Sequence, residues 1–219
     1  MCGRFAQTRT EKETLLKRFR LKKIVEDLVP RFNIAPGQNV PVILNENPSE
    51  LTQVRWGLIP FWSKDDKIGY KMINARAETI GEKPAFRNSL KKKRCLIIAD
   101  GFYEWQKRTD GKHPYRICRA DGEPFAFAGI WDSWQQDDKE IRTCSIITTG
   151  PNTLMKDIHD RMPVILQEDQ EEAWLSNIPV VEARQLLRPC PPDDLKAYEI
   201  SKLVNSPSNN EADIIEPIP

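Results

Sequence analysis

The second residue of the chain, Cys2, has the most reactive chemistry in the sequence. It follows Met1 and precedes Gly3 and Arg4. Removal of Met1 would leave an α-amine and a thiol on adjacent carbons, with ordinary pKa values of about 7.7–8.0 and about 8.5. Such a 1,2-aminothiol condenses with an aldehyde to a Schiff base, which the thiolate closes to a five-membered thiazolidine ring. A cysteine at position 2 usually belongs to a terminus without function, so these residues alone do not establish the chemistry.

Three further polar side chains have types that suit catalysis or anion binding. Asn74 and Arg76 share one face if their segment is extended, an alternation that is also typical of a solvated strand face. His159 is one of two histidines and lies at the predicted end of a short helix, where it acts either as a structural cap or as a catalyst.

Exposed aromatic side chains are expected in the segment after Pro60. Pro60 and the polar residues after Trp62 predict a loop that displays Phe61 and Trp62. Aromatic rings on loops stack on nucleobases, and the alternative is that Trp62 caps the core.

The length and composition indicate a soluble globular protein with one folded domain, or at most two small ones. The chain has 219 residues, of which 39% are hydrophobic and 30% charged, and no apolar run approaches the ~20 residues of a membrane span. A cytoplasmic monomer is therefore the expectation. The net charge of +1 predicts that any anion-binding face is a local patch. Residues 206–219, rich in Pro, Asn and acidic side chains, are expected to form a loosely held tail.

The cysteine pattern argues against a metal site. Five cysteines are scattered without a CxxC pair, and only two histidines accompany them. Beyond Cys2, the other four are expected to be structural: Cys95, Cys118, Cys144 and Cys190.

The predicted elements describe a mixed α+β protein. The strands are expected as an antiparallel meander that curls into a barrel-like sheet, with turns at Asp110-Gly111 and Asp121-Gly122 each making a hairpin. A capping box at Thr10–Glu13 is expected to open the first helix. The predicted strands cover residues 40–44, 51–56, 95–99, 102–107, 114–119, 125–130 and 141–149, and the later helices 83–93, 171–176 and 180–187.

Five stretches, taken in order, resemble one known family. They are Met1-Cys2-Gly3-Arg4-Phe5, Asn33-Ile34-Ala35-Pro36-Gly37, Ile73-Asn74-Ala75-Arg76-Ala77-Glu78, Ala99-Asp100-Gly101-Phe102-Tyr103-Glu104-Trp105 and Ile158-His159-Asp160-Arg161-Met162-Pro163. Their order and spacing are similar to those of the SRAP (SOS response-associated peptidase) family, and the likeness runs from residue 1 to about 205. The resemblance implies a single α+β domain over residues 1–205, with a central, largely antiparallel barrel-like sheet flanked by helices.

The resemblance also implies a function in the response to DNA damage. Family members are understood to remove their own Met1, so that Cys2 forms a thiazolidine crosslink with an abasic site in single-stranded DNA. The implied partner is single-stranded DNA with abasic sites, including strand–duplex junctions, and the implied location is cytoplasmic, at the nucleoid when DNA is bound. No metal and no cofactor are implied.

Roles are carried over only at matching positions. The implied catalytic residues are Cys2, Asn74, Glu104 and His159, with Glu104 as an acid/base whose pKa partial burial would raise. The residues implied or proposed to bind DNA are Arg4, Asn33, Pro36, Trp62, Arg76 and Arg161.

Two other functions remain open from the sequence. A thiol peptidase acting on other proteins would use Cys2 as nucleophile and His159 as base. A single-stranded DNA-binding module without chemistry would need only the aromatic and arginine side chains.

Overall fold

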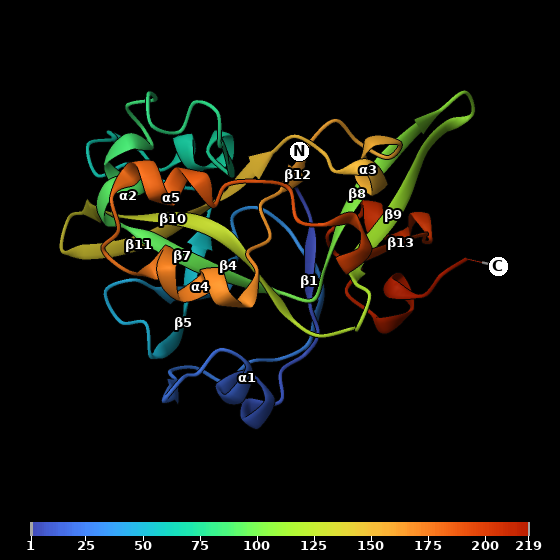
Figure 1. Cartoon of the computed structure of the whole chain (residues 1–219), viewed down its shortest axis with the longest axis horizontal. Helices are drawn as coiled ribbons and strands as arrows, with labels where there is room; N and C mark the ends of the chain where they lie inside the picture. The colour runs from blue at the N-terminus through green and yellow to red at the C-terminus, as the bar shows by residue number, and fades with distance from the viewer. Residues whose placement is uncertain (1, 219) are drawn as a thin grey trace.

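A computed structural model describes residues 2–218 of the chain. It contains two largely antiparallel sheets and short helices, which confirms the predicted α+β class (Figure 1). None of the helices in this part of the chain is long and apolar enough to cross a membrane.

Five strands of the larger sheet close into a ring, which confirms the barrel-like sheet. β4 (Asn39–Leu44) pairs with both β5 (Glu50–Trp56) and β7 (Arg94–Ala99), all antiparallel. β7 continues to β10 (Phe125–Gln136), and β10 to β11 (Lys139–Thr149). A parallel pairing of β11 with β5 then closes the ring. The predicted strands at residues 40–44 and 51–56 correspond to β4 and β5, which pair antiparallel within this barrel.

Three short strands extend the barrel at its edges: β2 (Lys23–Ile24), β6 (Asn74–Arg76) and β12 (Met162–Pro163). β6 runs parallel to β11, with Asn74 opposite Ile146, and β12 pairs antiparallel with the end of β11. The end of β11 therefore lies between β6, which begins at Asn74, and β12, which follows His159.

The smaller sheet has the strand order β13-β9-β8-β1-β3. Its strands are β1 (Phe5–Gln7), β3 (Arg31–Ile34), β8 (Gly101–Arg108), β9 (Gly111–Arg119) and β13 (Leu195–Glu199). β1 lies antiparallel to β8 with Phe5 opposite Phe102, so the residues before Phe5 run alongside those after Phe102. This register carries the N-terminal segment towards Glu104.

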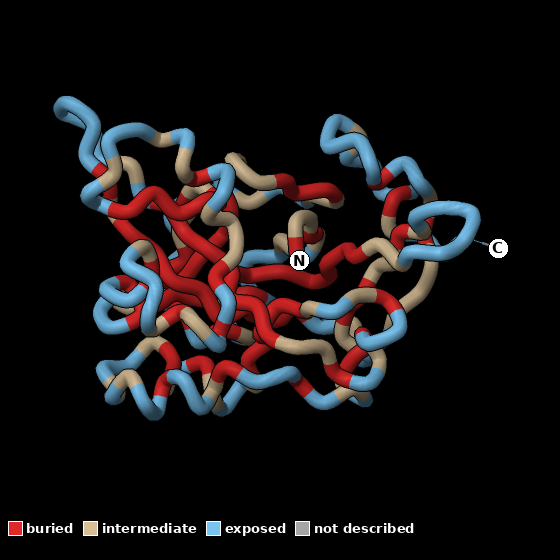
Figure 2. The backbone as a smooth tube through the Cα atoms, turned by 90° about the horizontal axis from the view of Figure 1, so that it is seen from above, coloured by how far each residue is buried: buried red, intermediate tan, exposed pale blue. Residues whose placement is uncertain are grey.

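The barrel strands are buried on both faces. On β7, Cys95, Ile97 and Ala99 pack with Phe5 and Trp56, whereas Leu96 and Ile98 pack on the opposite face towards the helices. This explains why residues 95–99 are a continuous apolar run rather than an alternating one. Figure 2 shows buried segments running through the middle of the molecule, with exposed loops around them.

The helices are short and lie outside the barrel. The α-helices are α1 (Lys12–Arg18), α2 (Arg87–Lys92), α3 (Thr153–Lys156), α4 (Glu168–Leu175) and α5 (Val180–Gln185). Residues 2–218 also contain four short 3₁₀ helices: η1 (Lys67–Lys71), η2 (Pro192–Asp194), η3 (Lys202–Asn205) and η4 (Ala212–Ile215).

Three predicted local features differ from the structure. α1 begins after Glu11 with no side-chain cap, so the capping box at Thr10–Glu13 is wrong. α2 begins only at Arg87, because Pro84 disfavours the helical conformation of the residue before it. The turn at Asp121-Gly122 joins no hairpin, because β9 pairs with β8 and β13 while β10 pairs with β7 and β11.

The C-terminal segment packs against the domain, which differs from the loosely held tail expected for residues 206–219. Backbone carbonyls of Ser206 and Asn209 accept hydrogen bonds from the Asn33 side chain, at 2.9 and 2.8 Å. Ile214 is fully buried. Composition misses this packing because the partners of the segment lie about 175 residues earlier in the chain.

Candidate active site

Cys2 lies at the start of the described chain, just before β1, and is fully buried. Its Sγ is 3.9 Å from the carbonyl oxygen of Arg4. Burial raises the pKa of the Cys2 thiol well above its ordinary value, and the negative charge of Glu104 adds to the increase. The thiol is therefore protonated at neutral pH. The predicted removal of Met1 lies outside the described residues.

Asn74 fixes the backbone of Cys2. Its Nδ2 donates a hydrogen bond of 2.8 Å to the Cys2 carbonyl oxygen. Its Oδ1 is buried and has no hydrogen-bond partner among residues 2–218. Because buried polar atoms are nearly always paired, this oxygen is an acceptor suited to a ligand donor.

Glu104 is the buried carboxylate of the site. It lies on β8 with 2% of its surface exposed. Burial raises the pKa of Glu104 to about 7, because the carboxylate loses its hydration. At neutral pH the group is therefore able both to accept and to donate a proton, as general acid–base catalysis requires.

His159 follows α3 and faces Glu104. Its Nε2 is 3.7 Å from Glu104 Oε2, and its Nδ1 accepts a 3.0 Å hydrogen bond from the backbone N–H of Arg161. Burial lowers the pKa of His159, so the imidazole is neutral at pH 7. We assign its proton to Nε2, because Nδ1 is an acceptor. The Asp160 carboxylate also approaches Nδ1 at 2.9 Å but is largely exposed.

The structure thus brings together all four residues that are predicted to be catalytic. Asn74 donates a hydrogen bond to the Cys2 carbonyl oxygen, and the charge of Glu104 contributes to the raised pKa of the Cys2 thiol. Glu104 in turn faces His159. They come from four separate segments, which the pairings of β1 with β8 and of β11 with β6 and β12 assemble. Their individual catalytic roles stay predictions.

Two of the predicted DNA-binding residues, Trp62 and Arg76, line a pocket of about 410 Å³ next to this site. We call it the Trp62 pocket; Asn74 also lines it, together with Met72, Lys83 and Phe86. Trp62 is half exposed, as the loop prediction requires, so it does not cap the core. The pocket combines an apolar wall with two cationic side chains.

Arg4 and Asn33 instead bind other parts of the protein. Arg4 Nη1 donates to Asn33 Oδ1 at 2.7 Å and to the carbonyl oxygen of Val204 at 2.9 Å. Asn33 is 2% exposed. These side chains tie the N-terminal strands to the C-terminal segment, and any contact of theirs with DNA stays a prediction.

Arg161 and Pro36 also contact other parts of the protein or form part of a turn. Arg161 makes a bidentate pair with Glu78, at 2.7 and 3.0 Å, and donates to the carbonyl oxygen of Thr148 at 2.7 Å. The hydrogen bonds from Arg161 lower the pKa of Glu78. Pro36 is half-buried in a turn that continues through Gly37 at φ +88°.

Sequence reasoning missed the contribution of residues 83–86 to the Trp62 pocket. Lys83 and Phe86 line it, although the sequence placed both in a helix. The Lys83-Pro84 pair was the available signal, since it favours a helix start after the proline. Among residues 2–218, no group of three or more His, Cys, Asp or Glu side chains is arranged to hold a metal ion.

Comparison with known proteins matches the chain along nearly its whole length. The family model described as "SOS response associated peptidase (SRAP)" matches residues 1–207. The abasic site processing protein YoqW of Bacillus subtilis is 48% identical over 224 residues, covering 99% of both chains. The abasic site processing protein YedK of Escherichia coli is 32% identical over 230 residues and covers 100% of both. A crystal structure of a Bacteroides thetaiotaomicron protein superposes with a TM-score of 0.91 at 32% identity, covering 99% of this chain and 100% of that one.

Proposed function

This chain belongs to the SOS response associated peptidase (SRAP) family, and on that basis we propose that it processes abasic sites in single-stranded DNA. It would do so by covalent capture, as an enzyme that first removes its own Met1. The observation that carries the proposal is the placement of Glu104, whose pKa burial raises to about 7, between Cys2 and His159.

The first step is hydrolysis of the Met1–Cys2 peptide bond. One water is consumed, free methionine leaves, and the α-amine of Cys2 is released. Asn74 holds the carbonyl of Cys2 while this happens, through its 2.8 Å hydrogen bond. Glu104 in its carboxylate form takes a proton from the attacking water, and its raised pKa then favours return of that proton to the leaving amine.

The second step joins the protein to the ring-opened sugar. The Cys2 amine attacks the aldehyde carbon, and the aldehyde oxygen leaves as water when the C=N bond of the Schiff base forms. The thiol then adds across that bond: sulfur bonds to carbon and its proton passes to nitrogen, closing the thiazolidine. We assign the transfer of this proton to Glu104, because burial keeps the thiol protonated and raises the pKa of Glu104 to about 7.

His159 is proposed to act on the sugar. Its neutral imidazole presents Nε2–H on the side of Glu104, so it is able to donate to the ring oxygen as the cyclic sugar opens to the aldehyde. The buried Oδ1 of Asn74 supplies an acceptor for a sugar hydroxyl in the same place.

The Trp62 pocket supports a single strand as the partner. The half-exposed indole offers a stacking surface for a flanking base, and Arg76 and Lys83 offer charge to phosphates. Stacking on an aromatic side chain contributes roughly 1–3 kcal/mol per base and requires an unpaired base. This geometry favours a strand whose bases are not in a duplex at the lesion.

The test is incubation of the protein with an oligonucleotide that carries one abasic site, followed by a denaturing gel and intact mass spectrometry. We expect a heat-stable adduct with the mass of the protein without Met1, plus the DNA, less one water. Cys2→Ala keeps the amine but lacks sulfur, so it should give only a Schiff base that borohydride traps. Cys118→Ala, at another buried cysteine, should crosslink like the wild type.

Three outcomes would count against the proposal. Wild-type protein that lacks Met1 yet gives no adduct would exclude covalent capture. Steady turnover of peptides without DNA would favour the thiol peptidase. Equal protection of abasic DNA by wild type and Cys2→Ala would favour a binding module without chemistry.

A further inference from the structure

β8 contacts the segment that carries His159 at two points. Glu104 and Gln106 are two residues apart on this strand, so their side chains leave it on the same face. Glu104 Oε2 lies 3.7 Å from His159 Nε2, and Gln106 Nε2 donates a 2.8 Å hydrogen bond to the backbone carbonyl oxygen of Asp157. Asp157 is the C-cap of α3 and comes two residues before His159.

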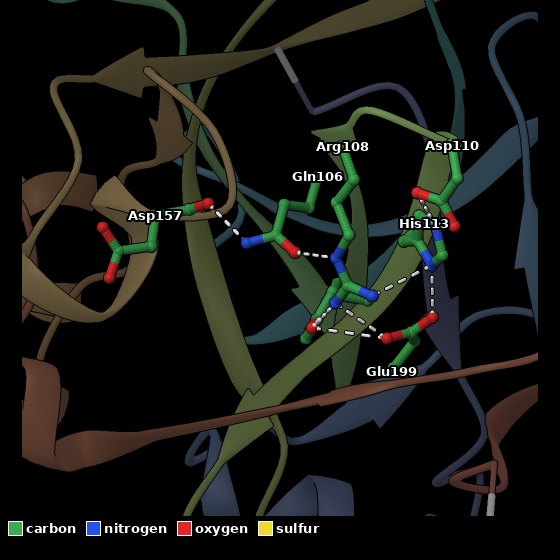
Figure 3. Close-up of polar contacts among 7 residues, drawn as sticks. Gln106, Arg108, Asp110, His113, Asp157 and Glu199 are labelled. Atoms are coloured by element: carbon green, nitrogen blue, oxygen red, sulfur yellow. Dashed lines mark hydrogen bonds and ion pairs between the residues drawn. The ribbon is translucent and has the colours of Figure 1, made fainter.

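The Gln106 amide has only one orientation that satisfies both of its neighbours. Arg108 Nε donates a 2.6 Å hydrogen bond to Gln106 Oε1, so the amide oxygen faces the guanidinium. The NH₂ group must then face Asp157, whose carbonyl oxygen accepts. Figure 3 shows this chain of contacts running from Asp157 through Gln106 to Arg108.

Arg108 is in turn held from β9 and β13. Its Nη2 donates to Glu199 Oε2 at 2.9 Å and to the Tyr115 hydroxyl at 2.5 Å. Glu199 and Asp110 both contact the ring of His113, at 2.6 and 3.0 Å (Figure 3). These contacts therefore hold the long Arg108 side chain in one conformation. Arg108 in turn holds the Gln106 amide in one conformation.

We propose that Gln106 is a positioning residue for His159, which deepens and rests on the function proposed above. Through the Asp157 carbonyl, the amide sets where α3 ends and hence how the imidazole faces Glu104. Arg108 acts one step further out by orienting the amide. Gln106 touches no reacting atom in this scheme.

Energetics separate this role from a structural one. Gln106 makes one neutral hydrogen bond to this segment, and because that bond lies near the surface its contribution to stability is modest. A misplacement of about 1 Å at a catalytic group costs on the order of 10²-fold in rate. Loss of the Gln106 contact should thus affect the reaction far more than the fold.

Gln106→Glu is the most informative variant. The new carboxylate still accepts from Arg108 but has no N–H for the Asp157 carbonyl, so it replaces an attraction by a repulsion. Gln136→Glu, at the exposed end of β10, adds the same charge elsewhere and is the matched control. Arg108→Ala, which leaves the Gln106 amide unoriented, should give a smaller effect in the same direction.

The first measurement is the reaction itself. Single-turnover crosslinking at saturating abasic oligonucleotide should slow by at least about tenfold in Gln106→Glu. The oligonucleotide concentration for half-saturation and the unfolding midpoint in urea should stay close to wild type. An unchanged rate would overturn the proposal, and a fall in rate that parallels lost folding would reduce it to a structural contact.

The second measurement reads His159 directly. The chain has two histidines, so ¹³C-labelled histidine gives two imidazole signals to follow against pH. The charged groups that act on His159 include Glu104 and Lys107 from β8 and Asp160 beside it. We expect the His159 signal and its titration midpoint to change in Gln106→Glu and not in Gln136→Glu.

The two proposals fail in different ways. If wild-type protein forms no adduct, the proposed function fails, and the His159 titration still decides whether Gln106 positions the ring. If wild type crosslinks and the His159 signal is the same in Gln106→Glu, positioning by Gln106 is excluded.

Discussion

At the scale of single residues, the burial of Glu104 that suits it to acid–base catalysis also lowers the stability of the folded protein at neutral and alkaline pH. Its carboxyl group is 2% exposed, and burial raises its pKa from an ordinary value near 4.5 to about 7. Between these two pH values the unfolded chain releases a proton that the folded protein keeps, so stability falls as pH rises through this window. Above pH 7 both states are ionised and the penalty is complete, at about 3 kcal/mol.

Glu104→Gln should therefore stabilise the protein at alkaline pH while abolishing acid–base catalysis. The gain in the free energy of unfolding should reach about 3 kcal/mol above pH 7 and vanish below pH 4.5. Urea unfolding of wild type and variant at a series of pH values measures it. Glu78→Gln is the control of opposite sign, because Arg161 lowers the pKa of Glu78. That variant should lose stability at neutral pH, and the loss should disappear as pH falls through the lowered pKa. A pH-independent difference for Glu104→Gln would contradict the burial argument.

At the scale of elements, local patterns predicted strands better than their partners. Residues 95–99 are continuously apolar and 110–111 is an Asp-Gly turn, and both predictions hold because their causes are local. The turn at Asp121-Gly122 has the same local form, yet the chain leaves one sheet there and enters the other. Which sheet residues 125–130 join is decided by their pairing with the edge of β7. The sequence of the turn does not specify that partner.

In the candidate site, as in the fold, residue types follow from local sequence, whereas their contacts follow from the pairing of distant strands. The sequence singles out Cys2, Asn74, Glu104 and His159 as a set only because the four stretches that contain them, together with a fifth, follow the order of one family. Their meeting follows from the register of β1 on β8 and from β11 lying between β6 and β12. Asn33 illustrates the converse, since its position in a matched stretch gave no sign of the carbonyl oxygens at 204, 206 and 209 that surround its amide.

Gly57 connects β5 to the segment that carries Trp62, and its geometry predicts a strong effect of a single methyl group. It has φ +125°, and a Cβ there would lie 2.7 Å from the carbonyl oxygen of Gly69 in η1. Gly57→Ala should therefore displace η1 or cost more than about 2 kcal/mol in the free energy of unfolding.

Gly122→Ala is the matched control for this substitution. Gly122 also has a positive φ, +77°, but a Cβ added there would have no neighbouring atom within 4 Å. Its cost should be limited to backbone strain, about 1–2 kcal/mol. Equal losses for the two variants in urea unfolding would show that backbone strain alone, rather than the contact with η1, makes Gly57 necessary.

At the scale of the whole molecule, the N-terminal and C-terminal segments pack together and are joined by hydrogen bonds. Arg4, just before β1, and Asn33, on β3, donate hydrogen bonds to backbone carbonyl oxygens between residues 204 and 209. The Tyr103 hydroxyl donates to the Phe32 carbonyl oxygen at 2.5 Å. Ile214 then closes a small cluster with Tyr103 and Val204. Because Tyr103 precedes Glu104 on β8, the C-terminal segment supports the strand on which the acid–base group lies.

The pair Ile214→Ala and Ile218→Ala tests whether this support is energetic. Ile214 is fully buried and Ile218 is 43% exposed, so the same chemical change is made inside and outside the packed segment. Ile214→Ala should lower the free energy of unfolding by about 2–5 kcal/mol, and Ile218→Ala should stay within about 0.5 kcal/mol of wild type. Urea unfolding compares them directly. Near-zero changes in the free energy of unfolding for both variants would support the loosely held tail that composition predicts. The position of β8 would then depend on strand pairing in the sheet alone.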